Sequence, residues 1–147
     1  MKKIVWSVCL LLMAGITATA QKSATFIESG RAIRGYDPVA YFMQEKAVPG
    51  VDSLVYQWNN ADWYFSSREH LDQFKANPAK YAPQYGGYCA YGLSNGYKAP
   101  TNADAWTITD GKLYLNYNLE VRDEWNKQRA ERIKKADQNW PAVKNKK

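Results

Sequence analysis

The sequence contains few of the residues that form covalent cross-links or bind metals. Its 147 residues include two cysteines, Cys9 and Cys89, and a single histidine, His70. Cys9 lies in an N-terminal apolar run that we expect to be removed, so one cysteine remains. A single cysteine excludes an intramolecular disulfide and leaves stability to packing. The scarcity of Cys and His also gives no set of paired zinc ligands.

Long apolar runs are absent apart from one near the N-terminus. Lys2 and Lys3 precede the run Ile4–Ile16, and Ala18–Ala20 supplies small residues before Gln21. This order is typical of a signal peptide, and the run is shorter than the roughly 20 residues of a comfortable membrane span. We expect a signal peptide at 1–20 and a periplasmic or extracellular protein with no stable membrane insertion after cleavage. A signal anchor is the alternative.

Several functional patterns are also missing. The net charge is +6, but no long basic run alternates with aromatic residues, so we expect no nucleic-acid partner. No Ser-His-Asp arrangement is recognisable, and Gly86-Gly87 is too short to indicate a phosphate-binding loop. We therefore assign no catalytic residue, and the sequence leaves open whether the protein is an enzyme.

Aromatic residues are plentiful, at 14% of the chain, and they form two predicted hairpins. The segment 54–58 alternates, 59–62 is a turn, and 63–65 returns as a second strand. The segments 106–109 and 112–116 alternate around Asp110-Gly111, a strong hairpin signal.

Two helices accompany these hairpins. Ser66 and Glu69 form a capping-box pattern that starts a helix running to about residue 76, before Asn77-Pro78. Asn118 can cap a long helix to about residue 138, which Pro141 would end. The sequence thus predicts a small single-domain α+β protein with an N-terminal arm at 21–34, the domain at 35–141 and a basic tail at 142–147.

Some side chains are candidates for ligand binding. Asp37 precedes Pro38 and is either a ligand-binding carboxylate or a helix cap, and the cap needs no further partner. Tyr36, Tyr88, Tyr91 and Trp106 either line a small-molecule pocket or belong to the core.

The segment Tyr85–Gly92 contains Cys89 among tyrosines and glycines. Its thiol is a nucleophile, a metal ligand or a small buried group. A reactive thiol would need a lowered pKa from a cation, a helix N-terminus or a metal. We expect this loop to lead into one helical turn.

A set of motifs resembles a known family. The run Trp63–His70, with Phe74, Asn77-Pro78 and Tyr81 after it, resembles the YHS domain. With Asp37–Ala40 and Gly87–Gly92 added, the chain is similar to the exported "YHS domain-containing (seleno)protein" group. The resemblance extends from about Gly35 to Trp140.

The resemblance implies transition-metal handling, with copper as the metal. The positions that carry thiols in metal-binding relatives are Ala40, Ser66 and His70 here, so the usual cysteine cage is absent. A copper site with fewer ligands than that cage would use Cys89 and His70, with Met43 as a further soft donor. Some members carry selenocysteine, which we place at Cys89, and this implies redox chemistry or soft-metal capture at that position more than packing.

Three functional hypotheses follow. The first is a small binding module for a metal ion or a small molecule, with Cys89 and His70 as metal ligands. The second is a thiol-dependent redox protein in which Cys89 is the nucleophile and His70 or Tyr88 assists. The third is a non-catalytic interaction domain in which the thiol is merely buried.

Overall fold

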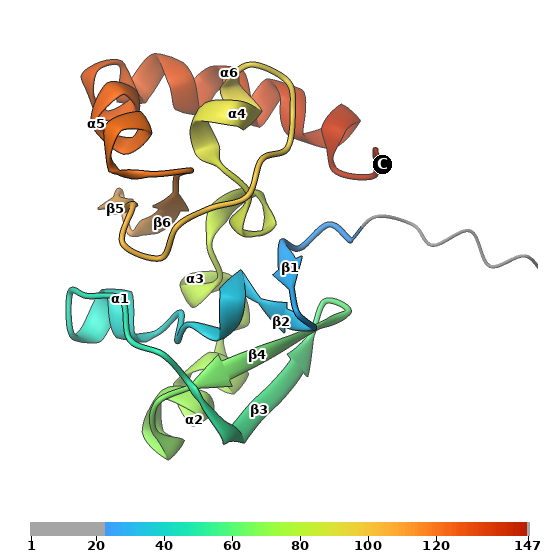
Figure 1. Cartoon of the computed structure of the whole chain (residues 1–147), viewed down its shortest axis with the longest axis vertical. Coiled ribbons are helices and arrows are strands. Elements are labelled where there is room, and N and C mark those ends of the chain that lie inside the picture. The colour runs from blue at the N-terminus through green and yellow to red at the C-terminus, as the bar shows by residue number, and fades with distance from the viewer. Residues whose placement is uncertain (1–22, 147) are drawn as a thin grey trace, which may run out of the picture.

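The computed structural model describes residues 23–146, which form a small α+β domain (Figure 1). Within this range the strands pair as three antiparallel hairpins, β1–β2, β3–β4 and β5–β6. The predicted fold class is therefore confirmed, and β1–β2 is an additional short hairpin. The predicted signal peptide lies outside the described residues.

In chain order the elements are β1 (Ile27–Glu28), β2 (Arg31–Ala32), η1 (Ile33–Gly35), α1 (Ala40–Met43), β3 (Val51–Trp58), β4 (Ala61–Phe65), α2 (Arg68–Ala76), α3 (Pro78–Tyr81), η2 (Gln84–Gly87), α4 (Ala90–Ser94), β5 (Trp106–Thr109), β6 (Lys112–Leu115), α5 (Leu119–Lys127) and α6 (Arg129–Val143).

The hairpin β3–β4 is confirmed, but its turn is shorter than predicted. The connection consists of Asn59 and Asn60, whose φ angles are 53° and 58°. Asparagine tolerates this left-handed region better than most residues, and two such residues match the twist of a tight hairpin. The predicted turn over 59–62 is therefore wrong, since Ala61 and Asp62 already belong to β4.

The hairpin β5–β6 forms as the Asp-Gly pair predicts. Thr109 lies opposite Lys112, and the two turn residues, Asp110 and Gly111, have φ angles of 52° and 70°. A two-residue turn with positive φ at both positions needs this residue chemistry, which explains why the sequence identified it correctly.

The helix α2 begins one residue later than the capping-box pattern predicts. Ser67 is the N-cap, and its hydroxyl oxygen accepts a hydrogen bond from the backbone N–H of His70 at 3.2 Å. Ser66 instead donates its hydroxyl to Asp37 Oδ2 at 2.6 Å. The prediction of Ser66 as N-cap is wrong because this tertiary hydrogen bond takes its side chain. The predicted end of the helix, before the Asn-Pro pair, is confirmed.

The long C-terminal helix is confirmed as α6, but the predicted uninterrupted helix from 118 is wrong. The chain leaves helical geometry at Gln128 (φ −129°, ψ 37°), which separates α5 from α6. Asn118 caps α5 as predicted, accepting a hydrogen bond from the N–H of Val121 at 2.8 Å. Pro141 does not end the helix, since α6 continues to Val143. Proline removes its own N–H bond, and so close to the C-terminus the loss is tolerated.

In the described part of the chain, buried apolar side chains form two core clusters. The first core cluster lies in the hairpin half of the molecule, β1 to α3, and the second in the helical half, α4 to α6 (Figure 1). The strand β6 belongs to both. Leu113 and Leu115 join the first cluster and Tyr114 joins the second, because alternate side chains of a strand point to opposite faces. The β5–β6 hairpin therefore joins the two halves.

Residues 23–34, which we expected to be an arm, pack against the domain. Phe26 is buried in the second core cluster and Ile33 in the first, while Ile27 stays exposed. The backbone N–H of Phe26 donates to the carbonyl of Gly86 at 2.8 Å. This segment thus crosses η2 and contacts both halves.

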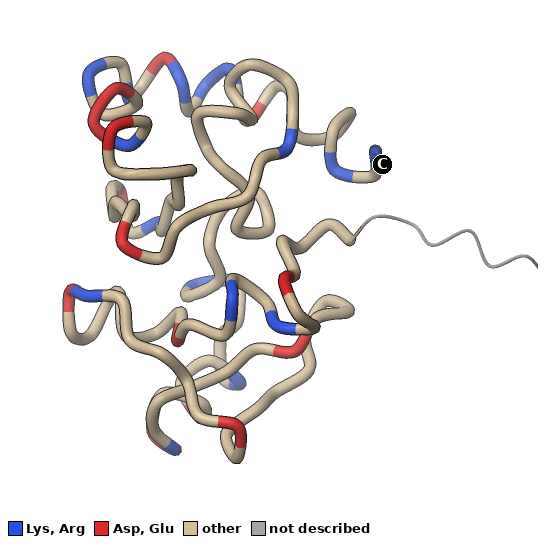
Figure 2. Tube along the Cα trace, viewed as in Figure 1, with Lys and Arg blue, Asp and Glu red and all other residues tan. Residues whose placement is uncertain are grey.

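Charges of both signs occur along α5 and α6 (Figure 2). Pairs such as Lys135 with Glu131, at 2.7 Å, lie one helical turn apart on the exposed face. No helix among residues 23–146 has the length and apolar character needed to cross a bilayer.

Candidate functional site

The carboxylate of Asp37 is fully buried and connects two elements. Its Oδ1 accepts from the backbone N–H of Val39 at 2.9 Å and of Ala40 at 3.2 Å, at the start of α1. Its Oδ2 accepts from the N–H and the hydroxyl of Ser66, at 2.8 and 2.6 Å. These are the contacts of a capping residue that also ties α1 to the loop before α2.

His70 completes this network. Its Nδ1 lies 2.7 Å from Asp37 Oδ2, and the ring is buried. Because the carboxylate is an acceptor, Nδ1 carries the hydrogen in this bond. One ring nitrogen of the predicted metal ligand is thus used in a bond that holds α2 to the residues before α1.

The second predicted metal ligand lies elsewhere. Cys89 directly precedes α4, which lies beside α6, whereas α2 lies at the lower end of the molecule (Figure 1). The structure therefore places Cys89 and His70 in different halves. Met43, the further soft donor, is exposed at the end of α1. Within residues 23–146, no group of three or more His, Cys, Asp or Glu side chains is arranged to hold a metal ion.

Cys89 is the N-cap of α4 and only 2% exposed. Its sulfur accepts a hydrogen bond from the N–H of Gly92 at 3.5 Å and lies 3.6 Å from Asn116 Oδ1, to which the S–H donates. The backbone N–H of Cys89 donates to the carbonyl of Ala99 at 3.0 Å. The residue is thus held by contacts from three segments of the chain, two of them to the thiol and one to its backbone.

Burial raises the pKa of the Cys89 thiol, and backbone N–H groups at Gly92, Tyr117 and Tyr91 oppose this only in part. Desolvation disfavours a thiolate because it disfavours any charged form. The thiol is therefore protonated at neutral pH, which matches its role as donor to Asn116. The lowered pKa expected of a reactive cysteine is not found here.

A pocket of about 280 Å³ opens onto this thiol. Its walls come from α4 and the segments on either side of it, from the loop after β6 and from the first turn of α5. Two of its tyrosines, Tyr97 and Tyr117, are 51% and 53% exposed, so aromatic surface continues to the rim. The Cys89 pocket is lined by Cys89, Tyr91, Tyr97, Ala99, Tyr117 and Val121.

Asn116 is a residue that the sequence analysis did not identify. It is fully buried directly after β6, and its Oδ1 accepts from both the Cys89 thiol and the N–H of Tyr91, the latter at 3.0 Å. Its Nδ2 has no hydrogen-bond partner within residues 23–146. The signal in the sequence that could have identified Asn116 is its position as a polar residue directly after the apolar segment Leu113–Leu115.

Of the five predicted ligand-binding residues, Tyr91 alone lines the Cys89 pocket, and the guanidinium of Arg132 lies 3.9 Å from the centre of its ring. Tyr88 donates its hydroxyl to the carbonyl of Ser23 at 3.0 Å and lines a separate depression. Asp37 belongs to the network described above, and Tyr36 and Trp106 are half-buried against the first core cluster.

The candidate site is therefore a pocket in the helical half that is lined by Cys89, whose thiol is protonated, and by aromatic side chains. None of the other residues that line it carries a formal charge at neutral pH, so its chemistry is that of an apolar binding site. Comparison with protein-family models, with curated proteins and with solved structures found no match.

Proposed function

We propose that this protein is a small binding module that holds a small apolar molecule in the Cys89 pocket. The observation that carries this proposal is the combination of a neutral, buried thiol with aromatic and aliphatic walls in a pocket of about 280 Å³. The expectation that the protein is exported rests on its N-terminal sequence and is part of the proposal.

The size of the pocket supports an apolar ligand. An apolar cavity of about 150 Å³ is enough to bind benzene in another protein. Ligand pockets are mostly apolar with few polar groups that fix orientation. Here Cys89 and the tyrosine hydroxyls supply the few polar groups of the lining, while the rings of Tyr97 and Tyr117 and the side chain of Val121 supply contact area. A monocyclic aromatic molecule matches these dimensions.

The thiol geometry favours binding over thiol chemistry. A nucleophile or a soft-metal ligand must be a thiolate, and burial raises the pKa of Cys89. No second cysteine is present among residues 23–146 to resolve an oxidised sulfur. The redox and copper hypotheses stay predictions, and the binding module needs neither.

Toluene provides a direct probe of the pocket. We expect the ¹H–¹⁵N spectrum of the protein to show saturable shifts at Tyr91, Gly92 and Val121 when toluene is added. Val121→Phe would fill the pocket from α5 and weaken toluene binding at least about tenfold, since the added ring takes the space of the ligand. Val51→Phe, on the exposed part of β3, is the matched control and should bind normally.

Toluene shifts that persist in Val121→Phe, or that never saturate, would remove the proposal. A Cu(I) titration separates the copper hypothesis. A site shared by Cys89 and His70 requires both Cys89→Ser and His70→Ala to weaken Cu(I) binding. Because the two residues lie in different halves, we expect His70→Ala to leave Cu(I) affinity unchanged.

A further inference from the structure

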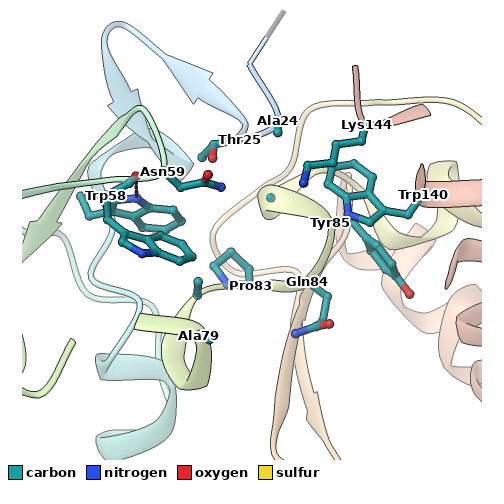
Figure 3. A pocket seen from close by; sticks show the side chains of 13 residues that line it. Ala24, Thr25, Trp58, Asn59, Ala79, Pro83, Gln84, Tyr85, Trp140 and Lys144 are labelled. Carbon is teal, nitrogen blue, oxygen red and sulfur yellow. Dashed lines mark hydrogen bonds between the residues drawn. The ribbon is translucent and has the colours of Figure 1, made fainter. Parts of the chain in front are cut away.

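A second cavity, of about 220 Å³, lies between the two halves of the molecule. Figure 3 shows Trp58 and Asn59 of the β3–β4 hairpin on one side and Tyr85, Trp140 and Lys144 on the other. We call it the tryptophan cavity. It is lined by Ala24, Thr25, Trp58, Asn59, Trp63, Ala79, Ala82, Pro83, Gln84, Tyr85, Gly86, Trp140 and Lys144.

Its aromatic walls are held in place from behind. The indole N–H of Trp63 donates to the carbonyl of Trp58 at 3.0 Å, and the two rings lie 6.0 Å apart. On the opposite side the rings of Tyr85 and Trp140 pack edge to face, with centres 5.9 Å apart. Tyr85 is fixed by a hydrogen bond from its hydroxyl to Asp137 at 2.8 Å. Rigid aromatic walls favour a planar ring as the ligand, because little side-chain freedom is lost on binding.

The charge of the lining has one sign. Among the described residues that line the cavity, Lys144 alone carries a formal charge at neutral pH. In Figure 3 its side chain extends past Trp140 towards the space between the two groups of lining residues. No carboxylate belongs to the lining, so a ligand with a negative charge would meet attraction without a competing acid.

A buried hydroxyl lies at the same cavity. Thr25 is 1% exposed, and its Oγ1 has no hydrogen-bond partner within residues 23–146. Thr25 lines the cavity, with the side chain of Asn59 beside it in Figure 3. An unpaired buried hydroxyl costs free energy unless a ligand or water pairs with it. The amides of Asn59 and Gln84 add further donors.

We infer that the tryptophan cavity binds a small aromatic carboxylate. The ring would lie between Trp58 and Trp140, and the carboxylate would accept hydrogen bonds from the Lys144 ammonium and the Thr25 hydroxyl. The volume of about 220 Å³ limits the ligand to a single ring or a small fused ring. This site is separate from the Cys89 pocket, and neither proposal depends on the other.

Benzoate and its neutral counterpart benzyl alcohol test this inference by calorimetry on the purified protein. We expect benzoate to bind about fivefold more tightly, the upper end of what a solvent-exposed ion pair contributes. Lys144→Gln should abolish that preference. Thr25→Val should also weaken the binding of benzoate, because it removes the hydroxyl donor. Lys134→Gln, on the exposed face of the same helix α6, is the matched control and should leave binding unchanged.

The location of binding is read from the indole N–H resonances. Benzoate should shift the indole N–H resonances of Trp58 and Trp63. The backbone amide resonance of Val121, in the Cys89 pocket, should stay unshifted. Equal affinity for benzyl alcohol, a full preference in Lys144→Gln, or shifts confined to the Cys89 pocket would each overturn the inference. Binding of methyl glucoside in place of benzoate would overturn the ligand class. Thermal unfolding of Thr25→Val verifies that the variant is folded.

Discussion

Asp37 illustrates how much a single side chain organises in this protein. Its carboxylate is buried and accepts hydrogen bonds from backbone N–H groups, the Ser66 hydroxyl and the His70 imidazole. A buried carboxylate is tolerated only when such donors replace water. The network therefore has a structural role, holding α1, the loop before α2 and α2 itself in one arrangement.

Replacing Asp37 by Asn should destabilise the protein by about 2–4 kcal/mol. The amide keeps one acceptor oxygen and places an NH₂ group against donors, so buried hydrogen bonds are lost. Urea denaturation measures the change in the free energy of unfolding. Asp52→Asn, at an exposed carboxylate paired with Arg31, is the control and should change it by less than about 1 kcal/mol. A variant at position 37 as stable as the control would contradict this role.

The Cys89 thiol should react with iodoacetamide only at high pH. Burial raises its pKa, so the rate should rise with a midpoint above the value of about 8.5 for a free cysteine. A raised pKa in the folded state also gives stability that is present below the unfolded pKa and is lost as pH rises through the folded pKa. The urea-unfolded protein is the control. A folded-state midpoint at or below that of the unfolded protein would contradict the burial argument.

At the scale of elements, η2 depends on one close approach. Gly86 has a φ of +64°, and a Cβ there would lie 1.8 Å from the carbonyl oxygen of Ala24. The segment before β1 crosses η2 at this point, where Phe26 bonds to Gly86. No side chain fits without moving the backbone of one of the two segments.

Gly86→Ala should therefore cost far more stability than a glycine substitution in an open turn. Gly111 is the matched control, since its φ is +70° and no atom lies within 4 Å of a Cβ placed there. Gly111→Ala should cost about 1–2 kcal/mol, the conformational penalty alone. We expect the loss for Gly86→Ala to exceed this by at least about 2 kcal/mol, because the overlap adds to the same penalty. Equal losses in thermal or urea unfolding would show that the close approach is unimportant.

Elements with local signals were predictable, and those decided by distant partners were not. The Asp110-Gly111 turn and the Asn118 cap form from residues adjacent in sequence, and both were predicted. Ser66 matched a capping box, but Asp37, 29 residues away, takes its hydroxyl. No local pattern contains that information. The break at Gln128 likewise follows a continuous helical pattern in the sequence.

At the scale of the whole molecule, β6 holds two cores together. Leu113 and Leu115 pack into the first core cluster, and Tyr114 packs into the second, 5.1 Å from the ring of Trp125. A strand with both faces buried transmits any loss of packing to both halves. The two halves should therefore unfold as one cooperative unit.

Leu113→Ala tests this coupling. Truncating this buried leucine should lower the free energy of unfolding by about 2–5 kcal/mol. Amide hydrogen exchange should then accelerate in both β4 and α6 by the same factor. Leu119→Ala, at an exposed position at the start of α5, should leave exchange in both unchanged. Faster exchange confined to the hairpin half would contradict the cooperative unit.

The candidate site also combines local and distant information. The loop around Cys89 and the contribution of Tyr91 were predicted, since both lie in one segment. Tyr117 and Val121 enter the pocket from beyond β6, and their position depends on how α5 packs. The pairing of Cys89 with His70 rested on the family resemblance, and the tertiary arrangement gives each a different partner, Asn116 and Asp37.

Protection of Cys89 by a pocket ligand tests the central claim most directly. The rate of Cys89 modification by methyl methanethiosulfonate is measured at pH 9 with increasing toluene. A molecule in the pocket would cover the thiol, so the rate should fall to a plateau with the same half-saturation as the toluene shifts in the ¹H–¹⁵N spectrum. Val121→Phe should show no further protection by toluene. A rate that is independent of toluene while those shifts saturate would contradict the account.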